Sequence, residues 1–159
     1  MSELSFLPAH ELARRIQAKD VGCLELLDHF LERVDRYNPA LNAIIELDPD
    51  RARDRARQAD AALAKGEVWG PFHGVPMTIK EAFGVAGLDM TWGDPELASH
   101  IPDTNATVVD RLMDAGVTLF GTTNVPLWLM DWQTFNTLYG TTNNPWDLSR
   151  APGGSSGGS

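Results

Sequence analysis

An amphipathic stretch that runs directly into a short apolar one constrains the fold of this chain more than any other feature. Apolar side chains recur every three or four positions across residues 105–116, which predicts a helix with one buried side. They are Val108, Leu112 and Ala115. The apolar run at 117–120 follows immediately and has the length of a buried strand. A helix that leads straight into a buried strand is typical of a sheet with helices packed on it, so we expect an α/β fold.

Two more apolar runs have the length of strands, and a further helix is predicted between them. The runs cover 43–47 and 75–79, and residues that favour turns border both. A helix is predicted over 48–65, because Asp48 is a favourable N-terminal cap and Pro49 suits a first helical turn. This alternation of strands and helices supports the α/β assignment.

Residues 1–40 are expected to form a helical hairpin. Residues 7–20 carry apolar side chains four positions apart, and residues 23–39 carry a longer stripe of the same kind. Pro39 is expected to end the second helix, because proline lacks the N–H that a continuing helix needs. The stripe consists of Leu24, Leu27, Leu31 and Val34.

Composition and charge exclude several functional classes. With 159 residues, 43% of them hydrophobic and 22% charged, the chain is long and apolar enough for a substantial core. Lysine and arginine number 13 against 22 acidic residues, a net charge of −9 with no basic patch, so we expect no nucleic-acid partner. No apolar run has the length of a bilayer span, and the first residues do not read as a secretory leader. We therefore expect a cytoplasmic protein with no membrane partner.

Cysteine and histidine usage gives no sign of a metal or a cofactor. Cys23 is the only cysteine, which excludes a disulfide within the chain and a cysteine-based zinc site. The four histidines are scattered without the close spacing that is typical of zinc sites. They are His10, His29, His73 and His100. We expect neither a metal nor a cofactor.

Regular periodicity fades after residue 121, and the chain becomes rich in Thr, Asn, Gly, Pro and Trp. Long ordered loops in compact domains are commonly functional. At most one short helix is expected, near 127–132. Trp128 and Trp132 stand four residues apart there and form either a buried helical face or the wall of an acyl-binding site. The final residues, APGGSSGGS, taken alone have the composition of a flexible linker.

Three segments resemble, in order, consecutive blocks of the amidase signature family, serine hydrolases that cleave amide bonds with a serine, cis-serine and lysine triad. They read GVPMTIKEAFGVAGLDMTWGDP, LFGTTNVP and YGTTNNPWDLSRAPGGSSGGS. The letters NPWDLSRAP directly before GGSSGG distinguish this ending from a linker, because a linker has no reason to follow them. The resemblance extends from Leu4 to the last residue.

The family resemblance implies a mixed β-sheet flanked by helices, of which this chain supplies only the N-terminal part. On this interpretation residues 1–159 are a partial amidase domain, in which the helical hairpin at 1–40 precedes the start of the α/β core at 41–159. The glycine-rich block that carries the family's nucleophile belongs to a C-terminal remainder beyond Ser159.

The resemblance also implies roles for individual residues. Lys80 matches the lysine of the triad, and Ser155 matches the bridging serine, which follows a cis peptide bond at Gly154. The nucleophilic serine belongs to the later block. The residues expected to bind substrate or to support the backbone are Met77, Gly153, Gly154, Ser156 and Gly157.

The proposed chemistry explains why a lysine at a buried strand end suits this role. A serine hydroxyl is a weak nucleophile until a base removes its proton. Lysine is that base only when it is uncharged, so burial and a lack of carboxylates must lower its pKa from about 10.4. The preceding strand is apolar. Glu81, where the family most often has aspartate, should face away from Lys80, because neighbouring side chains alternate along extended chain.

We expect an amidase that hydrolyses a carbon–nitrogen amide bond of a small molecule through an acyl-enzyme. For the full-length enzyme, a homodimer is one oligomeric state that the sequence allows. Leu127, where many relatives have glutamate, points to a stand-alone amidase. The alternatives are the glutaminase subunit of a tRNA-dependent amidotransferase and a non-catalytic truncated product that assembles with a complementary amidase fragment. Without the nucleophile block, the chain alone is expected to be inactive and to aggregate.

Overall fold

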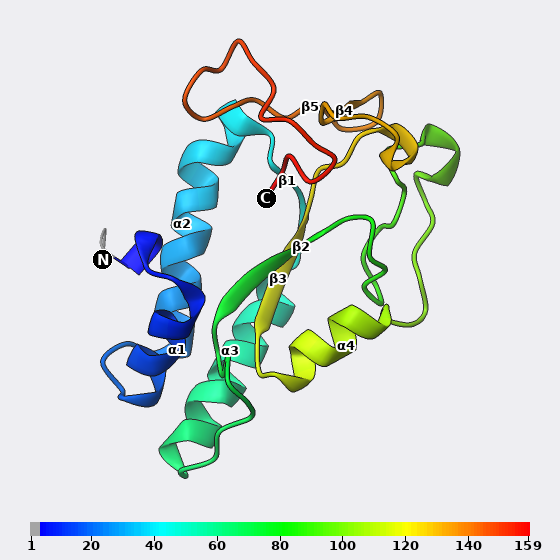
Figure 1. Ribbon diagram of the computed structural model, residues 1–159. Helices are drawn as coiled ribbons and strands as arrows, with labels where there is room; N and C mark the ends of the chain where they lie inside the picture. The colour runs from blue at the N-terminus through cyan, green and yellow to red at the C-terminus, as the bar shows by residue number, and fades with distance from the viewer. Residues whose placement is uncertain (1–3) are drawn as a thin grey trace. The chain divides into compact units, whose positions relative to one another are not determined.

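Helices and strands alternate along the chain as the sequence predicts. The computed structural model describes residues 4–159 (Figure 1). Its helices are α1 (Ala9–Gln17), α2 (Cys23–Leu41), α3 (Pro49–Ala64) and α4 (Thr107–Asp114). Its strands are β1 (Ile44–Leu47), β2 (Pro76–Lys80), β3 (Thr118–Thr123), β4 (Phe135–Asn136) and β5 (Gly140–Thr141). Short 3-10 turns form at η1 (Leu4–Phe6), η2 (Pro95–Leu97) and η3 (Leu127–Leu129).

The main sheet is mixed and has the strand order β1-β3-β2. β1 runs antiparallel to β3. On the other side of β3 lies β2. Thr118 N donates to Val75 O at one end of this strand pair and Glu81 N donates to Thr123 O at the other, so β2 and β3 run parallel. β4 and β5 form a separate antiparallel pair. This mixed architecture confirms the expected α/β fold class.

The chain forms two compact units whose segments interleave along the sequence. The first unit contains residues 4–33, Asp48–Met77 and Asp110–Phe120. The second unit contains Val34–Leu47, Thr78–Val109 and Gly121–Ser159. Lys80 and Ser155 both belong to the second unit.

Helical side chains form the core of the first unit, and one carboxylate joins two of its helices. The buried apolar residues include Leu12, Ala13 and Ile16 of α1, Leu26, Leu27 and Leu31 of α2, and Ala52, Ala56 and Ala59 of α3. Asp60 on α3 accepts hydrogen bonds from Cys23 N at 2.7 Å and from Leu24 N at 3.1 Å. The first N–H groups of a helix have no partner within it, so Asp60 caps α2 from a neighbouring helix.

Buried asparagines organise the loops of the second unit. Asn124, which follows β3, donates from Nδ2 to Thr142 Oγ1 at 3.0 Å and accepts at Oδ1 from Asn136 Nδ2 at 2.9 Å. Asn42 Nδ2 donates to Tyr139 O at 2.7 Å. The C-terminal residues return to pass beside β1 (Figure 1). Polar contacts between distant segments therefore order the loops that follow β3.

Two elements extend further than predicted. α2 continues through Pro39, which lies in its last turn. The proline removes only one N–H donor there, and Asn42 N still donates to Asn38 O at 2.7 Å. β3 continues to Thr123, because this residue is buried and pairs with Ile44 on β1. Apolar periodicity predicts neither extension, because the first depends on a backbone hydrogen bond and the second on pairing with a distant strand.

Near 127–132, where at most one short helix is expected, helical structure is confined to residues 127–129. Only the single turn η3 forms, because Trp128 has a φ of 53°, a left-handed conformation that cannot continue a helix. Trp128 and Trp132 are 46% and 85% exposed, so they do not form a buried helical face. The other interpretation of this pair, an acyl-binding wall, stays a prediction.

Replacing Asp60 tests the cap on α2. Asp60→Ala leaves the N–H groups of Cys23 and Leu24 without their acceptor and should destabilise the protein by about 1 to 2 kcal/mol. Thermal unfolding of the full-length protein measures this loss as a lower midpoint. Asp54→Ala is the matched control, because the ion pair of Asp54 with Arg57 is exposed. An equal effect of the two variants would contradict the cap.

Candidate active site

A lysine and a serine that are far apart in the sequence meet in the second unit. Lys80 is the last residue of β2, and its Nζ donates a hydrogen bond to Ser155 Oγ at 2.6 Å. Both residues are half-buried. The structure therefore brings together the two residues that the family resemblance assigned to a triad.

The strand positions the lysine by alternation. Successive side chains of extended chain point to opposite faces. Ile79 and Glu81 are 6% and 1% exposed, whereas Lys80 between them lies on the other face and reaches Ser155. Met77 has the same parity as Ile79, so its side chain lies opposite that of Lys80. A substrate contact from Met77 stays a prediction.

The surroundings of Lys80 make its charged form less favourable than that of an exposed lysine. Burial lowers the pKa of Lys80 below its ordinary value. In the part of the chain that the structure describes, no carboxylate lies within ion-pair distance of its Nζ. A nearby opposite charge would stabilise the ammonium and raise the pKa. The Lys80 amine therefore loses its proton more readily than that of an exposed lysine.

Glu81, the acid that follows Lys80 in the sequence, is bound elsewhere. Its carboxylate accepts hydrogen bonds from Thr91 Oγ1 at 2.6 Å, from Trp92 N at 3.1 Å and from Thr91 N. Burial raises the pKa of Glu81, and these hydrogen bonds oppose the rise. Glu81 faces away from Lys80, as the alternation predicts.

A threonine holds the glycine-rich turn that carries Ser155. The peptide bond between Gly154 and Ser155 is cis. Thr134 is buried, and its Oγ1 donates to Gly153 O at 3.0 Å and accepts from Gly157 N at 3.0 Å. A side chain at Gly157 would collide with this hydroxyl, so the close approach requires glycine. Thr134 thus joins the two ends of the turn around Ser155.

The other predicted residues belong to the same turn. Ser156 is exposed, and its carbonyl oxygen accepts a hydrogen bond from Ser159 N at 3.1 Å. Gly153 and Gly157 contact Thr134, and Gly154 directly precedes Ser155. Their roles in backbone support or substrate binding stay predictions.

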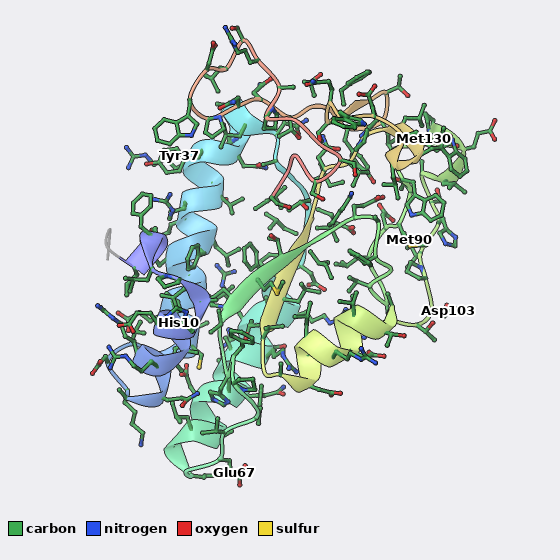
Figure 2. The ribbon with its side chains drawn as sticks, in the orientation of Figure 1. His10, Tyr37, Glu67, Met90, Asp103 and Met130 are labelled. Carbon is green, nitrogen blue, oxygen red and sulfur yellow. The ribbon has the colours of Figure 1, made fainter. Side chains whose placement is uncertain are left out.

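An open cavity of about 420 Å³ adjoins Ser155. It is lined by Leu129, Met130, Asp131, Trp132, Gly154 and Ser155. Met130, labelled in Figure 2, and Trp132 are each 85% exposed. Sequence reasoning missed Leu129, Met130, Asp131 and Thr134. Trp128 and Trp132 were the only residues of this segment for which the sequence suggested a role in the site. Residue spacing does not reveal that the loop folds back beside Ser155.

Neither a metal cluster nor a membrane span is found within residues 4–159. No group of three or more His, Cys, Asp and Glu side chains there is arranged to hold a metal ion. His73 Nε2 lies 3.1 Å from Ala59 O, and His29 Nε2 lies 2.7 Å from Ser5 Oγ. No helix in this range is both long and apolar enough to cross a membrane.

Comparison with known sequences shows one family. Residues 25–159 match the sequence profile of the family described as Amidase. One subunit of the glutamyl-tRNA(Gln) amidotransferase of Acidothermus cellulolyticus is 44% identical over 159 residues, which are 100% of this chain and 32% of that protein. The corresponding subunit of the Thermoanaerobacter pseudethanolicus enzyme is 40% identical over 157 residues, 99% of this chain and 32% of that protein. The chain thus spans about a third of the length of these relatives.

Comparison with solved structures gives the same fold. A fatty acid amide hydrolase matches with a TM-score of 0.91 and 29% identity, covering 96% of this chain and 27% of that one. A bacterial aryl acylamidase of the amidase signature family matches with a TM-score of 0.91 and 27% identity, covering 96% and 32%. The peptide amidase of Stenotrophomonas maltophilia matches with a TM-score of 0.88 and 33% identity, covering 97% and 33%. These similarities confirm the resemblance seen in the sequence.

Thr134 variants test whether its hydroxyl holds the turn at Ser155. Thr134→Val keeps the shape of the side chain and removes the bridge between Gly153 and Gly157, a loss of about 1 to 3 kcal/mol in local stability. Hydrogen exchange of the full-length protein should then be faster at the Gly157 N–H. Thr137→Val is the matched control at an exposed position. Slow exchange at Gly157 in Thr134→Val would show that other contacts hold the turn.

Proposed function

Because the chain belongs to the Amidase family, we propose that the protein hydrolyses a carbon–nitrogen amide bond, with Lys80 as the base and Ser155 as the serine that relays the proton. The observation that carries this proposal is the contact of 2.6 Å between Lys80 Nζ and Ser155 Oγ. An amine at this distance from a hydroxyl, with no acid beside it, is arranged to accept a proton rather than to pair with a charge.

The proposed reaction runs through an acyl-enzyme. Uncharged Lys80 takes the proton of Ser155, and Ser155 takes the proton of a nucleophilic serine that the family pattern places after Ser159. That serine attacks the amide carbon, the carbon–nitrogen bond breaks, and the proton returns from Lys80 through Ser155 to the departing nitrogen. Water then hydrolyses the ester by the same relay and releases the acid.

We propose a small-molecule amide as the substrate. The cavity beside Ser155 has a volume of about 420 Å³, which lies in the range of small-molecule sites. Apolar Leu129, Met130 and Trp132 line it together with the carboxylate of Asp131. A cytoplasmic location and a homodimer of the full-length enzyme stay predictions.

A second candidate is the glutaminase subunit of a tRNA-dependent amidotransferase. It is favoured by the 44% identity to a glutamyl-tRNA(Gln) amidotransferase subunit over the whole of this chain. Leu127 favours the stand-alone amidase instead, because many relatives have glutamate at that position. Both candidates use Lys80 and Ser155 in the same way and differ in their substrate and in their need for a partner.

We propose that the chain of 159 residues has no amidase activity alone, because the family's nucleophile block is not among its residues. Large apolar side chains are exposed in the second unit, with Trp146 at 95% and Met130 and Trp132 at 85%. Apolar surface of this kind promotes association, which supports the expectation that the isolated chain aggregates. Assembly with a complementary amidase fragment is the remaining alternative.

Removing the base should abolish hydrolysis by the full-length protein. Lys80→Ala is expected to lower kcat for benzamide by about a hundredfold or more, and Lys80→Arg should fail equally because a guanidinium stays charged. In the unmodified protein, kcat/KM should rise with pH as Lys80 loses its proton. Because burial lowers the pKa of Lys80, the plateau should be reached at a lower pH than an ordinary lysine requires. Ammonia release measures both effects.

Lys65→Ala is the matched control for these variants, because Lys65 is exposed at the end of α3. It should retain the rates of the unmodified protein. Full activity of Lys80→Ala would rule out the proposed base. A rate that falls as the pH rises would show that the charged lysine is the active form.

Glutamine separates the two candidate functions. A stand-alone amidase should release ammonia from benzamide and propionamide without a partner. The glutaminase subunit should be slow on both and should require glutamine together with the other amidotransferase subunits. Ammonia release from the three amides, measured with and without those subunits, distinguishes the candidates. Turnover that depends on the added subunits and is confined to glutamine would decide for the second one.

A further inference from the structure

A buried carboxylate next to Lys80 in the sequence holds a turn of the second unit. Glu81 is 1% exposed and accepts hydrogen bonds from Thr91 Oγ1 at 2.6 Å and from Trp92 N at 3.1 Å. Thr91 N donates to the same carboxylate, and Thr91 Oγ1 accepts from Gly93 N at 3.1 Å. The carboxylate and the threonine hydroxyl together bind successive N–H groups of the turn 91–93.

The same turn is packed from its other side. Gly93 has a φ of +69°, and a side chain there would lie 2.7 Å from Asn136 Cβ. Asn136 is itself buried, and its Nδ2 donates to Asn124 Oδ1 at 2.9 Å. The turn therefore cannot shift without losing either its contacts with Glu81 or its packing on the asparagine network.

This turn contacts the segment that lines the cavity at Ser155. Trp92 O accepts a hydrogen bond from Trp128 N at 2.8 Å. The two indole rings meet edge to face, with centroids 5.6 Å apart and planes at 74°. Trp128 and Leu129 have φ values of 53° and 62°, a left-handed conformation that non-glycine residues adopt only where their surroundings hold it. The contact with Trp92 provides such a hold.

We propose that Glu81 is a positioning residue for amide hydrolysis, which acts through Trp92 and Trp128 to hold the cavity wall 129–132 beside Ser155. The role in amide hydrolysis rests on the proposed function. The contacts of Glu81, Trp92 and Trp128 are independent of that function. No hydrogen bond or ion pair within residues 4–159 joins the Glu81 carboxylate to Lys80. Glu81 therefore acts on the binding of substrate rather than on the transfer of the proton.

Within residues 4–159 no cationic side chain is hydrogen-bonded to or ion-paired with Glu81, so its replacement strands no positive charge. The titratable groups that influence it or share its surroundings are Asp89, Glu46 and Tyr139. Their side chains are two carboxyl groups and one phenol, and none of them is a basic group. Glu81→Gln therefore removes an acceptor and relieves repulsion without leaving an unpaired cation, so it isolates positioning from charge balance.

Hydrogen exchange of the full-length protein tests the positioning without reference to activity. In Glu81→Gln the side-chain NH₂ competes with the N–H donors of the turn, so exchange at the Trp92 and Trp128 N–H groups should rise by about tenfold or more. Glu96→Gln is the matched control, because Glu96 is exposed on η2. Unchanged exchange at both tryptophans in Glu81→Gln overturns the proposal.

Kinetics with benzamide and acetamide test the consequence for substrate. Glu81→Gln should raise KM for benzamide by about tenfold and leave kcat within about threefold, because the wall contacts the ground state and the transition state alike. Acetamide carries no ring to contact the wall and should show a smaller rise in KM. The rise of kcat/KM with pH should keep its midpoint. A midpoint shifted to lower pH would mean that Glu81 stabilises the charge on Lys80, which overturns the positioning role.

Thr91 offers a second pair of variants, which keeps the test decisive if Glu81→Gln does not fold. Thr91→Val removes the hydroxyl that joins Glu81 to Gly93, whereas Thr91→Ser keeps it. Thr91→Val should reproduce the faster exchange at Trp92, and Thr91→Ser should behave like the unmodified protein. Equal behaviour of the two variants overturns the proposal. If the unmodified protein hydrolyses neither of these amides, nor glutamine in the presence of the other amidotransferase subunits, the proposed function fails while exchange at Trp92 still decides the positioning.

Discussion

The separation of an amine from its neighbouring acid at the end of β2 is the constraint on which the candidate site depends. Extended chain puts Lys80 and Glu81 on opposite faces, so these covalent neighbours do not pair. Lys80 reaches Ser155 at 2.6 Å, while Glu81 binds the turn at Thr91 and Trp92. An ion pair between them would have raised the pKa of Lys80 and made it unsuitable as a base. The strand thus presents the proposed base, Lys80, on one face and the proposed support for the cavity wall, Glu81, on the other.

Polar side chains rather than periodic structure order the loops around Ser155. Thr134 joins the two ends of the glycine-rich turn, and Asn124 and Asn136 connect the loops after β3. A buried polar group is costly unless it is hydrogen-bonded, so a satisfied network of this kind specifies one arrangement of the loops. This explains how a stretch without helices or long strands presents a hydroxyl at a defined point.

Features that depend on near neighbours were predictable from the residues. Asp48 accepts a hydrogen bond from Arg51 N at 3.2 Å at the start of α3, as its position before a proline indicates. The cavity wall was not predictable in this way, because the spacing of Trp128 and Trp132 is that of a helix. Trp128 instead takes a left-handed conformation beside Trp92, which belongs to a much earlier part of the chain. The spacing of neighbouring residues cannot predict the contact between Trp128 and Trp92.

The amino-acid order was sufficient to specify the mixed α/β class, the positions of the main helices and strands, and the family motifs at Lys80 and Ser155. Periodicity, caps and glycine turns act over a few residues, so they can be recognised without coordinates. Folding alone brought Lys80 to Ser155, Glu81 to the turn at Thr91, and Thr134 to the glycine-rich turn. These contacts join separate segments of one unit, and they form only when its strands and loops pack together, because no single segment carries both partners.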